Sequence, residues 1–410
     1  MNDYRSQEQT SDKEEKKYHT EVGHFQINHE REKICGDVFL SKRIPEENRV
    51  LCVLSDGMGH GVRANILATL TATMSLNFSM EHKDANALAG IIMKTLPVCS
   101  EVGLSYATFT IIDVAMESDT VSILEYDNPH TLIMRGNQIY EPEWTHVKYE
   151  GDTKDKRVMD LKKCTFVPER EDRIIFCSDG VTQTGLGKGI TMGWGRNNLI
   201  KFVQEIIETT PIISAADLAE RVVKQASAND LYAPKDDITC GVVYFRQARK
   251  TLLCTGPPFN PEKDNEFATI LRNFDGKKIV SGATTTEIIA RELKRTVTDE
   301  ERVDMTLPQS SKIEGIDLVT EGVLTLSKVT HILNNINVNS KMQFGKGPAD
   351  KICELLLNSD EIYILVGTKI NETHHDPTLP VEIEIRKSLI RRLTTVLSEK
   401  FMKVVIIDYM

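Results

Sequence analysis

The chain has 410 residues, of which 40% are hydrophobic and 27% are charged. This length predicts two or three domains, each with enough apolar residues to bury a core. The formal net charge is −10, from 60 acidic and 50 basic residues. This acidic balance argues against nucleic acid or an anionic membrane surface as the main partner, because both attract basic faces.

The sequence also disfavours membrane, secreted and disulfide-rich proteins. No apolar run approaches the roughly 18 residues that a membrane-spanning helix needs. The N-terminal residues are polar and contain no apolar segment of the signal-peptide kind. The eight cysteines form no CxxC pair, and several lie in apolar runs, so we interpret them as buried reduced thiols. These features predict a cytosolic protein.

The first part of the chain predicts a tail followed by an antiparallel α+β domain. Residues 1–20 hold almost nothing apolar and are expected to be disordered. Short β-branched runs bounded by turn residues then predict strands. These are 21–27, 49–57, 106–114, 120–127, 131–136, 172–180 and 238–245. Because helix pairs interrupt these blocks of strands, we expect a sandwich with helices outside, over residues 21–246.

Four stretches of this domain have the apolar spacing of helices. They are 62–80, 85–96, 197–207 and 214–226, the last with Ser214 as its expected N-cap. In the first helix Ile66, Leu70, Met74 and Phe78 recur every four residues, a stripe more typical of core than of an interface.

The pattern changes after residue 246, where strand-like and helix-like segments alternate. Such alternation predicts βαβ units and a parallel, Rossmann-like three-layer α/β domain over 250–410. The boundary between the two domains is expected near 246–250.

Aspartates stand repeatedly at the tips of the apolar strands of the first domain, although Asp is a poor strand residue. They are Asp37 in KICGDVF, Asp56 in SDGMGHG, Asp179 in SDGVT, and Asp236 and Asp237 in DDITC. If these tips converge at one edge of the sandwich, the gathered carboxylates repel one another and need cations. All-oxygen ligands favour Mg²⁺ or Mn²⁺. A pair of such ions lowers the pKa of a shared water, which predicts metal-assisted phosphoester hydrolysis.

The glycines beside these aspartates permit two interpretations. Gly57 has no side chain, so its carbonyl can approach a metal closely. A single Asp-Gly pair more often marks an ordinary turn. The repetition of the pattern at Asp56 and Asp179 favours the metal interpretation.

In chain order, GD, SDGMGHG, SDGVT and DDIT resemble the metal-dependent serine/threonine phosphatases of the PPM (type 2C) family. The match is best to the bacterial branch typified by the sporulation stage II protein E phosphatase. YATFTIIDV and EYDNPHTLIMRG match the paired central strands of that branch. The resemblance covers residues 21–246 and implies a PPM-type αββα sandwich.

The resemblance also implies roles for individual residues. Asp56 would bridge two Mn²⁺ or Mg²⁺ ions, Asp37 would serve the first ion directly or through water, and both would be catalytic. Asp237 stands where the eukaryotic branch has Asn, so it is a supporting residue. The nucleophile would be metal-bound water, with no covalent phosphoenzyme. The implied metal residues are Asp37, Asp56, Gly57, Asp179, Asp236 and Asp237.

The sequence departs from the eukaryotic branch at two positions. An arginine that grips the phosphate near the N-terminus is unmatched, and Met58 stands where that branch has histidine. His60, four positions after Asp56, is a candidate proton donor, but it can equally cap a helix or face solvent. His130 in NPHT and Arg63 are weaker candidates, for the proton donor and the phosphate contact respectively.

The resemblance also implies that helices after the metal loop couple partner binding or dimerisation to assembly of the metal site. A homodimer or an activating partner that contacts residues 62–96 is therefore a hypothesis.

The second domain contains two features that are candidates for binding. The segment GATTTEIIAREL places Thr284, Thr285 and Thr286 at a helix start, where backbone N–H groups can hold an anion. The alternative is ordinary N-capping by threonine. His374, His375 and Asp376 are a possible metal cluster, although a solvated loop explains them better. Neither a dinucleotide nor a P-loop motif is present. Similar domains on bacterial phosphatases of this branch imply a regulatory or ligand-sensing role.

Three functions follow from these observations. The first is a bacterial, cytoplasmic Mn²⁺- or Mg²⁺-dependent phosphatase that acts on phosphoserine or phosphothreonine of a regulatory protein in signal transduction. The second is a partner-binding scaffold with a phosphatase fold. The third is a phosphohydrolase of a small molecule. The complete set of aspartates favours the first.

Overall fold

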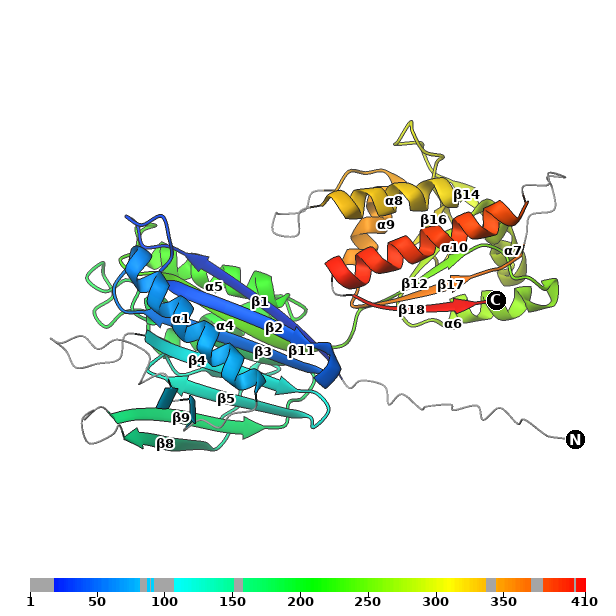
Figure 1. The fold of residues 1–410 in the computed structure, drawn as a ribbon. Helices are drawn as coiled ribbons and strands as arrows, with labels where there is room; N and C mark the ends of the chain where they lie inside the picture. Colours follow the sequence, from blue (N-terminus) through cyan, green and yellow to red (C-terminus); the bar gives the residue numbers. More distant parts are fainter. Residues whose placement is uncertain are drawn as a thin grey trace, which may run out of the picture. The chain divides into compact units, whose positions relative to one another are not determined.

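The computed structural model describes residues 18–81, 87–88, 90–91, 107–150, 158–336, 344–369, 379–401 and 403–410. The chain divides into two compact units, Met1–Gln247 and Ala248–Met410 (Figure 1). Most of the expected tail and most of the expected helix 85–96 lie outside the described residues. The tail prediction is wrong at its end, because Tyr18 is buried and the first strand begins at His19.

The first unit contains two antiparallel sheets. One has the order β1 (His19–Ile27), β11 (Ile238–Arg246), β10 (Asp172–Cys177), β6 (Leu132–Arg135) and β7 (Gln138–Ile139). The other has the order β2 (Asp37–Ile44), β3 (Arg49–Gly57), β4 (Ala107–Ala115), β5 (Thr120–Tyr126), β9 (Val158–Phe166) and β8 (Trp144–Glu150). Strands β2, β8 and β9 escaped the sequence analysis, because their charged residues interrupt the apolar pattern.

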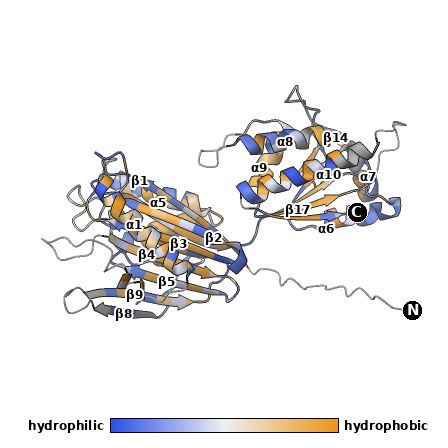
Figure 2. Ribbon diagram, in the orientation of Figure 1, coloured by the Kyte–Doolittle hydropathy of each residue, from blue (hydrophilic) through white to orange (hydrophobic). Residues whose placement is uncertain are grey.

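The two sheets pack face to face, and helices cover their outer faces (Figures 1 and 2). The core between the sheets joins residues such as Phe176 and Val243 to Leu54 and Ile112. The outer face of the first sheet packs against α4 (Gly195–Thr209) and α5 (Ala215–Asn229). The outer face of the second packs against α1 (Gly61–Met80). The expected α+β sandwich with helices outside is therefore what the unit shows.

Helix α1 contacts its sheet through small residues. Its buried positions are Gly61, Ala64, Ala68, Thr71, Ala72 and Ser75. Val62, Ile66 and Leu70 are instead 56%, 54% and 46% exposed. The expectation that Ile66 and Leu70 belong to the core is wrong, because the smaller side chains let the helix lie closer to the sheet.

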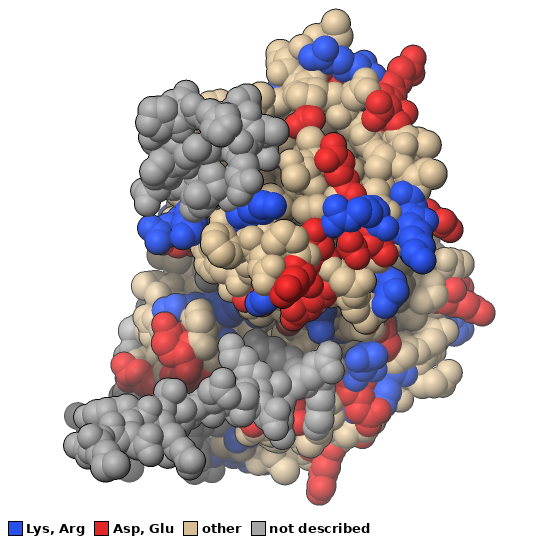
Figure 3. Space-filling view, turned by 90° about the vertical axis from the view of Figure 1, so that its right-hand side faces the viewer, with Lys and Arg blue, Asp and Glu red and all other residues tan. Residues whose placement is uncertain are grey.

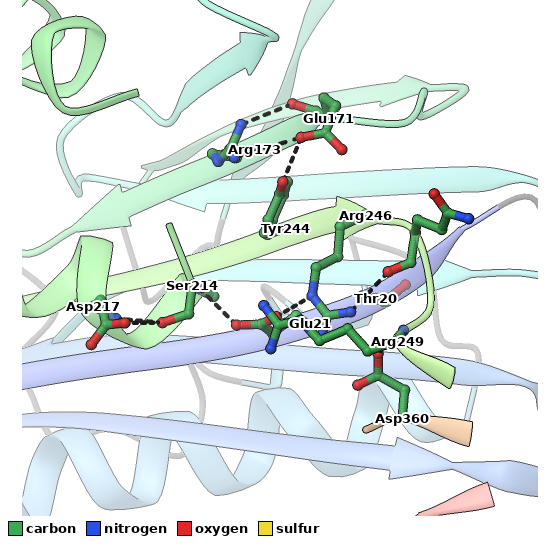
Figure 4. Close-up of polar contacts among 12 residues, drawn as sticks. Thr20, Glu21, Glu171, Arg173, Ser214, Asp217, Tyr244, Arg246, Arg249 and Asp360 are labelled. Carbon is green, nitrogen blue, oxygen red and sulfur yellow. Dashed lines mark hydrogen bonds and ion pairs between the residues drawn. The ribbon is translucent and has the colours of Figure 1, made fainter. Parts of the chain in front are cut away.

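A buried polar network joins β1, β10, β11 and α5 (Figure 4). The guanidinium of Arg173 is fully buried, lies 3.8 Å from the ring centroid of Tyr244, and donates to the Pro211 carbonyl at 2.6 Å. Glu21 accepts from Arg246 and, at 2.9 Å, from the backbone N–H of Ala215. The predicted N-cap Ser214 is confirmed, since its Oγ accepts from the Asp217 N–H at 3.1 Å.

The second unit contains one seven-stranded sheet. Its order is β14 (Thr298–Asp299), β15 (Ser311–Lys312), β16 (Leu318–Thr320), β13 (Lys277–Ser281), β12 (Lys250–Thr255), β17 (Glu361–Val366) and β18 (Val404–Tyr409). Strands β16, β13, β12, β17 and β18 pair in parallel, as the alternating pattern predicts. The short strands β14 and β15 are antiparallel and were not predicted.

Helices cover both faces of this sheet. One face packs against α8 (Val323–Asn335), α9 (Pro348–Leu357) and α10 (Leu379–Thr395), and the other against α6 (Asp264–Asn273) and α7 (Ala283–Leu293). Successive residues Leu252 and Leu253 of β12 point into different cores, as strand geometry requires.

Two broader expectations can be compared with the described residues. The seven described cysteines are buried and free, as predicted, whereas Cys99 lies outside this part of the chain. Among the described helices, none combines the length and apolarity that a bilayer crossing requires. On the face drawn in Figure 3, basic and acidic side chains are interspersed.

Candidate active site

Five aspartates stand at strand ends on both sheets of the first unit. Asp37 begins β2 and is the register partner of Asp56, the penultimate residue of β3. Asp179 follows β10 and begins the short helix α3 (Asp179–Thr182). Asp236 and Asp237 directly precede β11, which pairs with β10. Each sheet therefore contributes carboxylates at this edge.

Hydrogen bonds connect the aspartates across the sandwich. Ser178, between β10 and α3, donates from Oγ to Oδ2 of Asp37 at 2.7 Å. Oδ2 of Asp179 accepts a hydrogen bond from Nε2 of Gln183 at 2.8 Å, and the charges of Asp37 and Asp179 act on Asp56. The structure therefore brings the predicted carboxylates together from strands that are far apart in the sequence.

The glycines of these motifs are required by close packing. A Cβ at Gly36 would lie 2.7 Å from Oδ2 of Asp237, and one at Gly180 would lie 2.0 Å from the Asp237 carbonyl oxygen. A Cβ at Gly57 would lie 2.0 Å from the carbonyl oxygen of Ala64 in α1. The glycines thus let the strand ends and α1 approach one another, which an ordinary turn does not require.

Burial and mutual repulsion make these carboxyl groups weak acids. Burial, together with the charges of Asp37 and Asp179, raises the pKa of Asp56 to about 10. Burial raises the pKa of Asp37 to about 7 and, with the charge of Asp179, that of Asp236 to about 6. The pKa of Asp179 is also raised by burial. Such shifts mark a site where added positive charge is strongly favoured.

Three carboxylate oxygens at this edge have the chemistry of metal ligands. Oδ1 of Asp37, Oδ1 of Asp179 and Oδ2 of Asp237 are buried without a hydrogen-bond partner. Within the described residues, however, no group of three or more His, Cys, Asp and Glu side chains is arranged to hold a metal ion. The unpartnered carboxylate oxygens nevertheless have the chemistry that suits a hard cation.

His60 lies beside the carboxylates but has other contacts. It is the N-cap residue of α1 without a capping side-chain bond, and it is 57% exposed. Its Nδ1 lies 2.7 Å from Oε1 of Glu32, and its ring stacks on His29 with centroids 4.7 Å apart. The backbone N–H of His29 in turn donates to Oδ1 of Asp237 at 2.9 Å.

The remaining candidates have other contacts, are exposed, or lie outside the described residues. His130 contacts the buried carboxylate of Glu125 at 2.8 Å, which is a structural role. Arg63 is exposed in the first turn of α1. The segment that contains His374, His375 and Asp376 lies outside the described residues.

Sequence reasoning missed four residues at this edge. Ser178 was noted only as the end of a strand, and no role was given to His29, Glu32 or Asp127. Asp127, whose charge acts on Asp179, has a φ of 57° in the turn of EYDNPH. The signal in the sequence was an Asp in a turn next to a strand end, where polar residues often adopt the left-handed backbone conformation.

The family model for stage II sporulation protein E matches residues 46–246. These residues are a SpoIIE-family domain of the PP2C phosphatase type, as the motifs predicted. Membership of this class supports a protein phosphatase.

Among solved structures, the chain is similar to the phosphatase domain of SpoIIE from Bacillus subtilis, with 14% identity over 57% of this chain and 95% of that chain, at a TM-score of 0.42. It is also similar to RsbX in complex with magnesium, with 16% identity over 57% and 98% of the two chains, at a TM-score of 0.40. The S. agalactiae serine/threonine phosphatase matches at 13% identity over 55% and 99%, with a TM-score of 0.39. Among curated proteins, none matches the chain.

Proposed function

We propose that residues 21–246 form a Mn²⁺- or Mg²⁺-dependent phosphatase that hydrolyses phosphoserine or phosphothreonine on a regulatory protein. The observation that carries the proposal is the set of buried aspartates with raised pKa values and unpartnered oxygens, within a SpoIIE-family domain. Two divalent ions would supply a nucleophilic water near neutral pH and offset the charge of the phosphoryl group.

The chain's own residues would hold and orient these ions. Asp37 and Asp56 lie on one sheet, and Asp179 and Asp236 belong to the other, so the site would span the sandwich. Ser178 would fix the orientation of Asp37, and the His29 N–H would fix that of Asp237. The stacked His29 and His60 rings flank the edge where a substrate would enter.

The deciding experiment is hydrolysis of p-nitrophenyl phosphate and of a phosphoserine peptide with Mn²⁺, for the native chain, Asp56→Asn and Asp236→Asn. Asp160→Asn, which alters a half-exposed carboxylate on β9, is the matched control. We expect both site variants to lose at least a hundredfold in kcat and the control to keep full activity. Retained activity in both site variants would overturn the ligand assignment.

The exposed stripe of Val62, Ile66 and Leu70 on α1 favours a second proposal, namely contact with a second copy or an activating partner. A phosphatase could also bind a partner through this face. A scaffold would bind the partner in the same way but have no phosphatase activity. A phosphohydrolase of small molecules remains the third candidate, and preference for metabolites over the phosphopeptide would favour it.

We further propose that residues 250–410 form a Rossmann-like regulatory or ligand-sensing domain. The parallel strands and the cavity at their carboxyl ends support this role.

A further inference from the structure

A cavity of about 210 Å³ lies at the carboxyl ends of the parallel strands in the second unit. The turns after β12, β13 and β16 form its wall, and α10 contributes one side chain, that of Arg386. In parallel α/β sheets this edge is where ligands usually bind, since the turns there are free to present backbone groups. None of these residues belongs to the carboxylate edge of the first unit.

Two helices begin at the cavity, and neither is capped by a side chain. Gly282 is the N-cap residue of α7 and Gly322 is that of α8, and both line the cavity. The threonines of GATTTE therefore follow the N-cap position, which excludes N-capping by threonine as their role. The first backbone N–H groups of a helix lack intrahelical acceptors and carry partial positive charge.

Two hydroxyl groups of otherwise buried residues face the cavity. Thr255 at the end of β12 is 3% exposed, and Thr285 in the first turn of α7 is 1% exposed. Both line the cavity, and within the described part of the chain neither hydroxyl has a hydrogen-bond partner. A Cβ at Gly282 would lie 3.1 Å from Oγ1 of Thr285, so this hydroxyl faces the space that the glycine leaves open. Neither oxygen is enclosed by protein, so both hydroxyls are open to the cavity and available to a ligand.

Arg386 adds a positive charge to the same wall. Its Nη1 donates to the carbonyl oxygen of Gly367, directly after β17, at 3.2 Å. A Cβ at Gly256, where φ is 80°, would stand only 2.5 Å from that Nη1. The glycine in the turn after β12 thus allows the guanidinium to reach the cavity.

We propose that this cavity binds a phosphate group, either free or as the monoester of a small metabolite. Two helix starts, two unpartnered hydroxyls and one guanidinium form a set of donors suited to a dianion with several acceptor oxygens. At about 30 Å³ per water, the cavity has room for about seven waters, so it holds a phosphate and a few adjoining atoms. Glu321 at the wall would accept a hydrogen bond from a hydroxyl of the ester.

The test is isothermal titration calorimetry on the full chain with ribose 5-phosphate, adenosine monophosphate and inorganic phosphate. EDTA is present throughout, so that no divalent ion can hold the anion at the first unit. The variants are Thr285→Val, Gly322→Ala and Arg386→Gln. The controls are Thr394→Val, which removes another unpartnered hydroxyl, and Arg391→Gln, which removes an exposed charge from the same helix.

We expect at least one probe to bind, with an affinity about tenfold weaker in Thr285→Val and weaker still in Arg386→Gln. Both controls should bind as the native chain does. Tighter binding of an ester than of inorganic phosphate supports a metabolite as the source, and equal binding supports free phosphate. If Arg386→Gln fails to fold, Thr285→Val and Gly322→Ala carry the test. No binding of any probe at millimolar concentration, or binding that survives the cavity variants, would overturn the proposal.

Discussion

Ser178, which directly follows β10 of one sheet, donates from Oγ to Oδ2 of Asp37, which begins β2 of the other sheet, at 2.7 Å. The same Oγ accepts from the backbone N–H of Thr239 at 3.1 Å. A single hydroxyl therefore joins the start of β2, the end of β10 and the start of β11. It fixes one carboxylate relative to the others without adding charge.

Replacing Ser178 with Ala should damage both the fold and the candidate site. The loss leaves a buried carboxylate oxygen and a buried N–H unsatisfied, which costs about 1–3 kcal/mol of unfolding free energy. Urea unfolding measures this cost, and titration with Mn²⁺ should show weaker binding. Ser122→Ala, which removes an exposed hydroxyl on β5, is the control. Equal unfolding midpoints for both variants would contradict the role of Ser178.

The pH dependence of stability should reveal the raised carboxyl pKa values. Because folding raises the pKa of Asp37 to about 7 and that of Asp56 to about 10, the folded chain binds more protons than the unfolded chain above pH 4 or so. Stability without divalent ions must then fall as pH rises through this window. Thermal unfolding in EDTA should show a lower Tm at pH 8 than at pH 6.

Divalent ions should reverse this trend, since they favour the ionised carboxylates. We therefore expect Mn²⁺ to raise Tm more at pH 8 than at pH 6. Asp56→Asn removes the carboxyl group whose pKa is raised to about 10, and should flatten the dependence of Tm on pH in EDTA. If Tm falls with pH as steeply in Asp56→Asn as in the native chain, the pH effect comes from other groups.

Gly180 should not tolerate a side chain. Its Cβ would lie 2.0 Å from the Asp237 carbonyl oxygen, so Gly180→Ala must separate α3 from the Asp236–Asp237 segment. Overpacking of this kind costs about 1–3 kcal/mol, which a urea titration detects. Gly136→Ala is the comparison, because a Cβ there meets nothing within 4 Å and only its φ of 59° opposes the change. The prediction fails if Gly136→Ala is the more damaging of the two.

The outer face of α1 can be tested apart from its inner face. Ile66→Glu places a charge on an exposed position, so the folded monomer should keep its stability while any self-association is lost. Analytical ultracentrifugation of the native chain and of Ile66→Glu measures this directly. Lys42→Gln, which removes an exposed charge on β2, lowers the net charge by the same single unit and is the control. If the native chain sediments as a monomer, this face does not bind a second copy of the chain, and only a different partner remains for it.

The sequence predicted the positions of the carboxylates better than their surroundings. Asp56 and Asp179 were conspicuous because each ends an apolar run, and the antiparallel pairing then brought them together. Ser178 and His29 were missed because their importance comes from partners that lie 141 and 208 positions away in the chain.

Periodicity likewise gave a helix at 62–80 but misjudged its orientation. The stripe of Ile66 and Leu70 was the more hydrophobic face, yet the sheet contacts Ala64, Ala68 and Ala72. Hydrophobicity alone could not show that close approach favours the smaller side chains. The strand β8 was missed for a related reason, since its alternating charged residues resemble a loop until β9 is known to lie beside it.

The contact between Gly57 and Ala64 has a mechanical consequence. Where side chains separate two elements, a small displacement of one is absorbed by new rotamers in between. Here the backbone of α1 lies directly against the end of β3, next to Asp56, with no side chain between them to repack. A displacement of the helix would therefore be passed directly to the strand end that carries Asp56.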